Sequence, residues 1–145
     1  MIRKLFMALA ALAAAACAAP APTDTPATTT FIGIDGRPLV SAEGIIDYSV
    51  QEALTANPAA CAKAGGALQP VCRMQKPMCL ITFSDAGKSC TDGAQCGSGR
   101  CLAGNPTAGT GGGPGATGQC STTNDPCGCY QRIEKGVAQP TLCAD

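Results

Sequence analysis

The sequence predicts a small disulfide-rich domain made mostly of short β hairpins and loops, with one or two short N-terminal helices. Three observations support this fold class. Ten of the eleven cysteines lie between Cys61 and Cys143, a density typical of a stapled scaffold. The same region has few large apolar residues and no tryptophan, so it buries too little surface to offset chain entropy without covalent links. The N-terminus is typical of proteins exported to oxidising compartments, where cysteines pair.

Residues 1–16 are expected to form a signal peptide. Arg3 and Lys4 precede an uninterrupted run of twelve apolar residues, 5–16. Such a run is too short to span a bilayer, which takes about 20 residues in a helix. The run ends in small residues directly before Cys17.

These small residues and Cys17 resemble the lipobox of bacterial lipoproteins. The resemblance implies that a fatty acid such as palmitate is attached to Cys17 and that cleavage makes Cys17 the new N-terminus. Without Cys17 ten cysteines remain, an even number that can pair fully. The chain would then be held on a lipid bilayer in the bacterial cell envelope without a spanning helix. Residue 18 is alanine where some lipoproteins have aspartate, and the resemblance to these lipoproteins then favours attachment to the outer membrane, facing the periplasm. The alternative is ordinary signal-peptide cleavage and secretion.

Residues 17–30 are expected to be the lipid anchor and a disordered Pro/Thr tether. After Cys17 this segment has three prolines and no large apolar residue, a composition typical of a semi-rigid spacer. Residues 31–60 then form a flank of strand and helix. A short strand is expected over 31–34, followed by a turn over 35–38.

Two short helices are expected in the second part of the flank. Ser49 and Glu52 fit a capping box at the start of the first. Ile46, Val50 and Leu54 are spaced four apart and share one helical face, which we expect to pack on the cysteine-rich domain rather than to bind a partner. The second helix, 58–64, follows a change of direction at Asn57-Pro58.

Residues 61–145 form the disulfide-stapled domain. Strands are expected over 69–74 and 78–83, joined as a hairpin through 75–77. Residues 104–118 are rich in glycine and are expected to form a mobile loop, which we interpret as a tolerated insertion because binding loops usually present aromatic or charged groups.

Four cysteines follow a spacing of five and then four intervening residues, closed by a later fourth: Cys90, Cys96, Cys101 and Cys120. This pattern resembles small EGF-like and colipase-like extracellular modules, and bacterial cysteine-rich lipoproteins of unknown role carry comparable runs. The resemblance implies the pairs Cys90–Cys101 and Cys96–Cys120 but carries no function with it.

The sequence determines the pairing of the remaining cysteines less closely. A short closing loop favours Cys129–Cys143 as a third pair. By elimination, four cysteines pair among themselves in an order that the sequence leaves open: Cys61, Cys72, Cys79 and Cys127.

The composition argues against enzymatic, metal and nucleic-acid functions. The chain has no histidine, which removes the commonest general base and the usual imidazole ligand of zinc. Its carboxylates are scattered, and no Cys-x-x-Cys motif is present. The formal charge is zero and aromatic residues are few, so no basic, aromatic surface for nucleic acid is expected. We predict no catalytic residue, cofactor or metal.

The function favoured by the sequence is a structural or protein-interaction module that presents a surface to an unknown envelope or extracellular protein. The first alternative is a protease inhibitor in which Arg100, between Gly99 and Cys101, is displayed on a disulfide-clamped loop. The second is a thiol–disulfide redox protein that uses Cys127 and Cys129, because a bridge between cysteines two apart would be strained and easily reduced.

Overall fold

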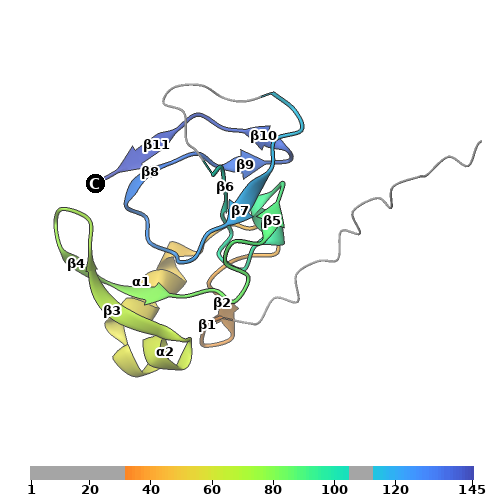
Figure 1. Cartoon of the computed structure of the whole chain (residues 1–145). Helices are drawn as coiled ribbons and strands as arrows, with labels where there is room; N and C mark the ends of the chain where they lie inside the picture. Colours follow the sequence, from red (N-terminus) through yellow and green to blue (C-terminus); the bar gives the residue numbers. More distant parts are fainter. Residues whose placement is uncertain (1–31, 105–112) are drawn as a thin grey trace, which may run out of the picture.

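A computed structural model of the chain describes residues 32–104 and 113–145 (Figure 1). The expected signal peptide 1–16, the anchor and tether 17–30 with Cys17, and residues 105–112 lie outside the described residues. The fold class is confirmed: the described residues form two helices, short antiparallel strand pairs and loops, joined by five disulfides. No helix among them is long and apolar enough to cross a bilayer.

The elements are short. The helices are α1 Tyr48–Ala56, α2 Pro58–Lys63 and the 3-10 turn η1 Gly93–Gln95. The strands are β1 Gly33–Ile34, β2 Arg37–Pro38, β3 Gly66–Val71, β4 Lys76–Ile81, β5 Ser89–Cys90, β6 Cys101–Leu102, β7 Gly118–Cys120, β8 Gly128–Tyr130, β9 Ile133–Glu134, β10 Val137–Ala138 and β11 Leu142–Ala144.

Side-chain caps start both helices. The Asp47 carboxylate accepts hydrogen bonds from the amides of Ser49 (2.9 Å) and Val50 (3.3 Å), which satisfies free N–H groups of the first turn of α1. The expected cap at Ser49 is therefore wrong by two residues, because Asp47 caps the helix through the amides of Ser49 and Val50 and leaves Ser49 inside the first turn. At α2, Asn57 accepts from the Ala60 amide at 3.1 Å, as its position before a first-turn proline suggested.

The hairpin of β3 and β4 is present, with its turn placed differently from the sequence expectation. Gly66 pairs with Ile81 and Val71 pairs with Lys76, so the chain reverses over residues 72–75 rather than 75–77. Cys72 and Gln75 adopt positive φ values of 55° and 51° at the two ends of this turn. Neither residue type signals a left-handed conformation, so the turn could not be located from composition.

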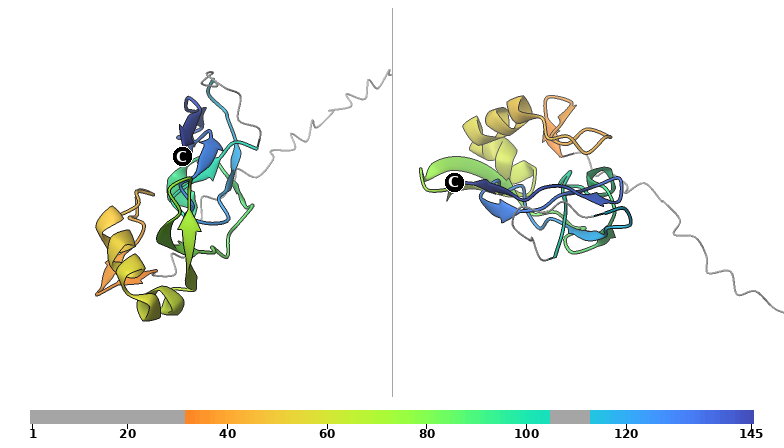
Figure 2. Two further views of the ribbon diagram at one scale, coloured as in Figure 1. Left: turned by 90° about the vertical axis from the view of Figure 1, so that its left-hand side faces the viewer. Right: turned by 90° about the horizontal axis from the view of Figure 1, so that it is seen from above.

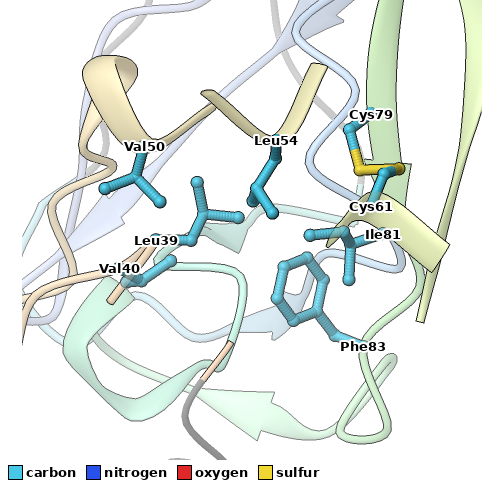
Figure 3. Packing of buried hydrophobic residues seen from close by; sticks show 8 residues of the cluster. All are labelled: Leu39, Val40, Val50, Leu54, Cys61, Cys79, Ile81 and Phe83. Atoms are coloured by element: carbon cyan, nitrogen blue, oxygen red, sulfur yellow. A yellow bond between two sulfur atoms is a disulfide. The ribbon is translucent and has the colours of Figure 1, made fainter. Parts of the chain in front are cut away.

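An aliphatic core joins the flank to this hairpin (Figure 3). Val50 and Leu54 of α1 are fully buried, and Ile46 packs beside them, so the expected apolar face does lie on the hairpin. The flank contributes half of the eight buried core residues, which are Leu39, Val40, Val50, Leu54, Cys61, Cys79, Ile81 and Phe83. The flank is therefore an integral part of the fold.

The C-terminal half is built from a three-stranded sheet of order β5-β7-β6 and the pairs β8–β11 and β9–β10. Figure 1 and the left view of Figure 2 show the helices and the β3–β4 hairpin at one end of the molecule, with β9 and β10 toward the other. A second core lies in this half and consists largely of sulfur: Cys90, Cys96, Cys101, Cys120, Ile133 and Ala138.

Five disulfides pair all ten cysteines from Cys61 onward. Both pairs implied by the module resemblance are formed, and so is the pair favoured by the short closing loop: Cys90–Cys101, Cys96–Cys120 and Cys129–Cys143. The four cysteines left unordered form Cys61–Cys79, which links α2 to β4, and Cys72–Cys127, which links the hairpin turn to the segment before β8.

The end of the glycine-rich segment belongs to the fold. Pro114 forms a β bridge with Val137, and the Ala116 amide donates to the Gly136 carbonyl at 2.8 Å. Strand β7 then begins at Gly118. The expectation of a mobile loop over 104–118 is therefore wrong for 114–118. Backbone pairing needs no apolar side chain, so composition was a poor guide there.

Candidate ligand pocket beside Arg100

Arg100 is the charged residue at the centre of the candidate site. It directly precedes β6, and only 7% of its surface is exposed. Its guanidinium carbon lies 4.4 Å from the centroid of the Tyr130 ring, and Nη1 donates a hydrogen bond to the Asp125 carbonyl. The protease-inhibitor alternative needs Arg100 displayed on the surface, whereas the ring and the carbonyl hold this side chain inward.

Among the described residues, no carboxylate lies within ion-pair distance of the Arg100 guanidinium. Their two ion pairs involve other side chains, and the partner of Nη1 is a neutral carbonyl. Burial lowers the pKa of the Arg100 guanidinium, while the neighbouring Tyr130 and Asp125 counteract part of that shift. An arginine nevertheless stays protonated in proteins, so the site contains a desolvated positive charge.

A cavity of about 380 Å³ opens beside this charge. Its walls come from three parts of the chain: Ile45 and Tyr48 from the flank, Met78 from β4 and Tyr130 from β8. Ile45 and Tyr48 are 66% and 74% exposed, so their side chains are accessible to a ligand in the cavity. The volume is in the range of pockets that hold small organic ligands.

Close contact between glycines positions the rim of the pocket. Gly44 and Gly99 both have positive φ, 78° and 67°. A Cβ atom on Gly99 would lie 2.5 Å from the Gly44 carbonyl oxygen, so the loop that carries Ile45 rests directly on the loop that carries Arg100. Any larger residue at Gly99 would push these two loops apart.

Two buried side-chain amides, those of Asn124 and Gln51, form the floor of the pocket. Asn124 is 2% exposed; its Oδ1 accepts from the Ile81 amide at 2.8 Å, and its Nδ2 donates to Gln51 Oε1 at 2.6 Å and to the Cys79 carbonyl at 3.1 Å. Gln51 in turn donates to the same Cys79 carbonyl at 3.0 Å. Both amides line the cavity, so its floor is fixed by hydrogen bonds to β4.

Carboxylates in the C-terminal half accept hydrogen bonds from backbone amides and so order its loops. Asp85 accepts from Gly97 at 2.7 Å. Asp92 accepts from two amides, Ala94 at 2.8 Å and Lys135 at 2.7 Å, and Asp125 accepts from Cys127 at 2.9 Å. These groups act as loop caps.

Cys127 and Cys129 do not form a redox pair. Cys127 is bonded to Cys72 and Cys129 to Cys143, so the strained bridge expected in the redox alternative is not formed. Three other sulfurs, those of Cys90, Cys96 and Cys120, lie within 4.8 Å of one another. Each already belongs to a disulfide, so this cluster marks where two bridges cross in the core.

Arg100 was singled out from the sequence, but the rest of the pocket was not. No motif marks Ile45, Tyr48 or Tyr130. Gln51 lies inside the expected capping box between Ser49 and Glu52, and Asn124 precedes Asp-Pro, a pattern typical of a turn. The one available signal was the presence of a tyrosine, Tyr48, next to a helix start in a chain with only two tyrosines.

Comparisons with protein-family models, with curated proteins and with solved structures found no match. The interpretation of the site therefore depends on its geometry and chemistry.

Proposed function

We propose that the chain is an exported, lipid-anchored, cysteine-rich lipoprotein that acts as a structural or protein-interaction module of the bacterial cell envelope. The observation that carries the proposal is the pairing of all ten cysteines from Cys61 to Cys143 in five disulfides. Disulfides of this density persist in oxidising compartments and are rare in the cytosol, which supports export.

The same pairing isolates Cys17. With the ten other cysteines in disulfides, Cys17 is the odd one, and it stands where the lipobox resemblance places a lipidated residue. A fatty-acid anchor at Cys17 holds the module on the membrane, with outer-membrane attachment facing the periplasm as the proposed location. Residues 18–30 then serve as the tether between the lipid surface and the folded part.

The folded part suits an interaction role. Its short strands are held by disulfides rather than by a large core, so its loops are presented on a rigid base. The proposed partner is an unknown envelope or extracellular protein.

Replacement of Cys17 tests the anchor. The full chain and its Cys17→Ser variant are expressed in a bacterium fed with radiolabelled palmitate, and the cells are fractionated. We expect the wild type to carry label and to sediment with membranes, and the variant to be unlabelled and soluble. A Cys129→Ser/Cys143→Ser double variant is the matched control and should stay labelled and membrane-bound. An unlabelled wild-type chain, soluble outside the cytoplasm, would instead support secretion.

A further inference from the structure

The pocket beside Arg100 combines apolar walls with positive charge. Ile45, Tyr48 and Met78 offer apolar and aromatic surface, while Arg100 and Arg132 are its charged residues. Within the described ranges 32–104 and 113–145, no aspartate or glutamate lines the cavity. A site of this composition is complementary to a ligand with an apolar body and one negative group.

The two arginines differ in their availability. Arg132 is half-exposed and pairs with Glu134, Nε to Oε1, at 3.4 Å. Arg100 is buried and, among the described residues, donates its one side-chain hydrogen bond to the Asp125 carbonyl. A guanidinium offers five N–H donors in a planar fork that matches the two oxygens of a carboxylate. Arg100 therefore retains donors for an anion, and the low polarity around it strengthens that interaction.

The position of Arg100 is fixed before any ligand arrives. The Tyr130 ring covers the guanidinium, and the Ser121 amide donates to the Arg100 carbonyl at 3.0 Å. A rigid cation loses little side-chain entropy when it binds an anion, which favours affinity. The exposed Tyr48 and Ile45 stand at the flank wall, where they can cover the apolar part of a ligand.

We propose that this pocket binds the carboxylate of a small apolar or aromatic group, with Arg100 as the anion-binding residue and Tyr48 and Ile45 as the apolar wall. Two sources share this chemistry: a free organic acid, and the C-terminal residue of a peptide whose last side chain is apolar. This pocket chemistry specifies what the proposed interaction module binds, and in that respect the inference rests on the proposed function.

Calorimetric titration tests the proposal. The protein is the full-length Cys17→Ser chain with its other cysteines oxidised, so that neither lipid nor detergent competes for the apolar wall. The probes are 3-phenylpropionate and a hexapeptide ending in phenylalanine, each compared with its uncharged amide. We expect the acids to bind about tenfold or more tightly than the amides, which is the effect of one charge-assisted contact. Binding of phenylpropionate as tight as that of the peptide identifies a small-acid site; binding of the peptide alone identifies a C-terminus.

Variants locate the contact. Arg100→Gln should weaken acid binding about tenfold or more, and Tyr48→Ala should weaken acid and amide alike by several-fold. Because Arg100 is buried, its variant is checked for retained circular dichroism, and Tyr48→Ala provides a test at a more exposed position. Arg73→Gln, at the hairpin turn, is the matched control and should bind normally, because Arg73 does not line the cavity and its side chain is 83% exposed.

Three results would overturn the inference: no binding of either acid, equal binding of acids and amides, or acid binding that is unchanged in a folded Arg100→Gln variant. The anchor experiment reads lipid incorporation and membrane partition, whereas this one reads affinity in solution. Failure of one is therefore distinguishable from failure of the other.

Discussion

Asn124 connects three segments that are distant in the sequence. It joins Gln51 of α1 to the open side of β4 by bonding the Ile81 amide and the Cys79 carbonyl. Strand β4 has β3 on one side only, so its other edge would leave buried backbone groups unpaired. One side-chain amide takes the place of a neighbouring strand at these positions.

Asn124→Ala should therefore destabilise the fold strongly. The change leaves the Ile81 amide and Gln51 Oε1 without these partners in a buried environment, which we expect to cost about 2–3 kcal/mol in the free energy of unfolding. Urea unfolding of the oxidised protein, followed by circular dichroism, measures it. Gln69→Ala removes an exposed amide from β3 and is the control, with an expected change within about 0.5 kcal/mol. A loss for Asn124→Ala no larger than that of the control would contradict the structural role.

The sequence could not assign this role to Asn124. An asparagine before Asp-Pro is typical of a turn, and the same residue type satisfies turns on the surface and strand edges in the interior. The choice depends on a contact 43 residues away with the Ile81 amide, which local pattern does not encode. Arg100 illustrates the same limit: its place between glycine and cysteine was visible, but its contact with Tyr130 was not.

At the scale of elements, the start of α1 is the clearest case of a contribution to stability that depends on pH. Hydrogen bonds from the Ser49 hydroxyl and then from the Val50 amide lower the pKa of the Asp47 carboxyl below its ordinary value of 3.8. A lowered pKa in the folded state means that this stabilisation is fully present above pH 3.8 and is lost as pH falls through the folded-state value.

Asp47→Ala should lower the urea midpoint at pH 7, and its difference from the wild type should shrink as the pH falls below 3.8. Asp47→Asn is the matched control, since asparagine caps helices about as well and does not titrate there; it should unfold near the wild type at pH 7. Urea midpoints at several pH values give the comparison. A larger loss for Ser49→Ala than for Asp47→Ala would return the cap to the residue that the capping-box pattern indicated.

Elements with a periodic or paired signal were predictable. The apolar spacing of Val50 and Leu54 predicted α1 and its buried face, and the apolar runs around Pro77 predicted the β3–β4 hairpin. The turn of that hairpin escaped prediction, because Cys72 is held at its positive φ in a turn that also bears a disulfide to a distant cysteine. A tertiary link overrides local propensity at such a position.

At the scale of the whole molecule, the described residues form two cores of different composition. The flank and hairpin bury aliphatic side chains, whereas the C-terminal half buries four cysteines with Ile133 and Ala138. Several of the few large apolar residues in the cysteine-rich region are exposed, among them Met74, Val137 and Leu142. In a domain this small, crossed disulfides occupy the interior, so hydrophobicity alone does not identify which residues are buried.

This division predicts how the molecule responds to reduction. Each bridge should contribute about 2–4 kcal/mol, so the five together contribute about 10–20 kcal/mol, which is comparable with or larger than the total stability of about 5–15 kcal/mol that a domain usually has. Full reduction should therefore unfold the protein. The C-terminal half should lose its amide protection completely, because its core consists largely of the sulfurs themselves.

Thiol titration and hydrogen exchange on the full-length Cys17→Ser chain test whether the ten cysteines are paired and whether reduction unfolds the protein. The denatured, unreduced protein should titrate no free thiol. After reduction and blocking of the thiols, amides in β5, β6 and β7 should exchange at the rates of an unfolded chain. Iodoacetamide-treated but unreduced protein is the control and should keep its protection. Two free thiols mapping to Cys127 and Cys129 would restore the redox alternative, and a reduced chain that kept its protected amides would show that the aliphatic core is sufficient for folding.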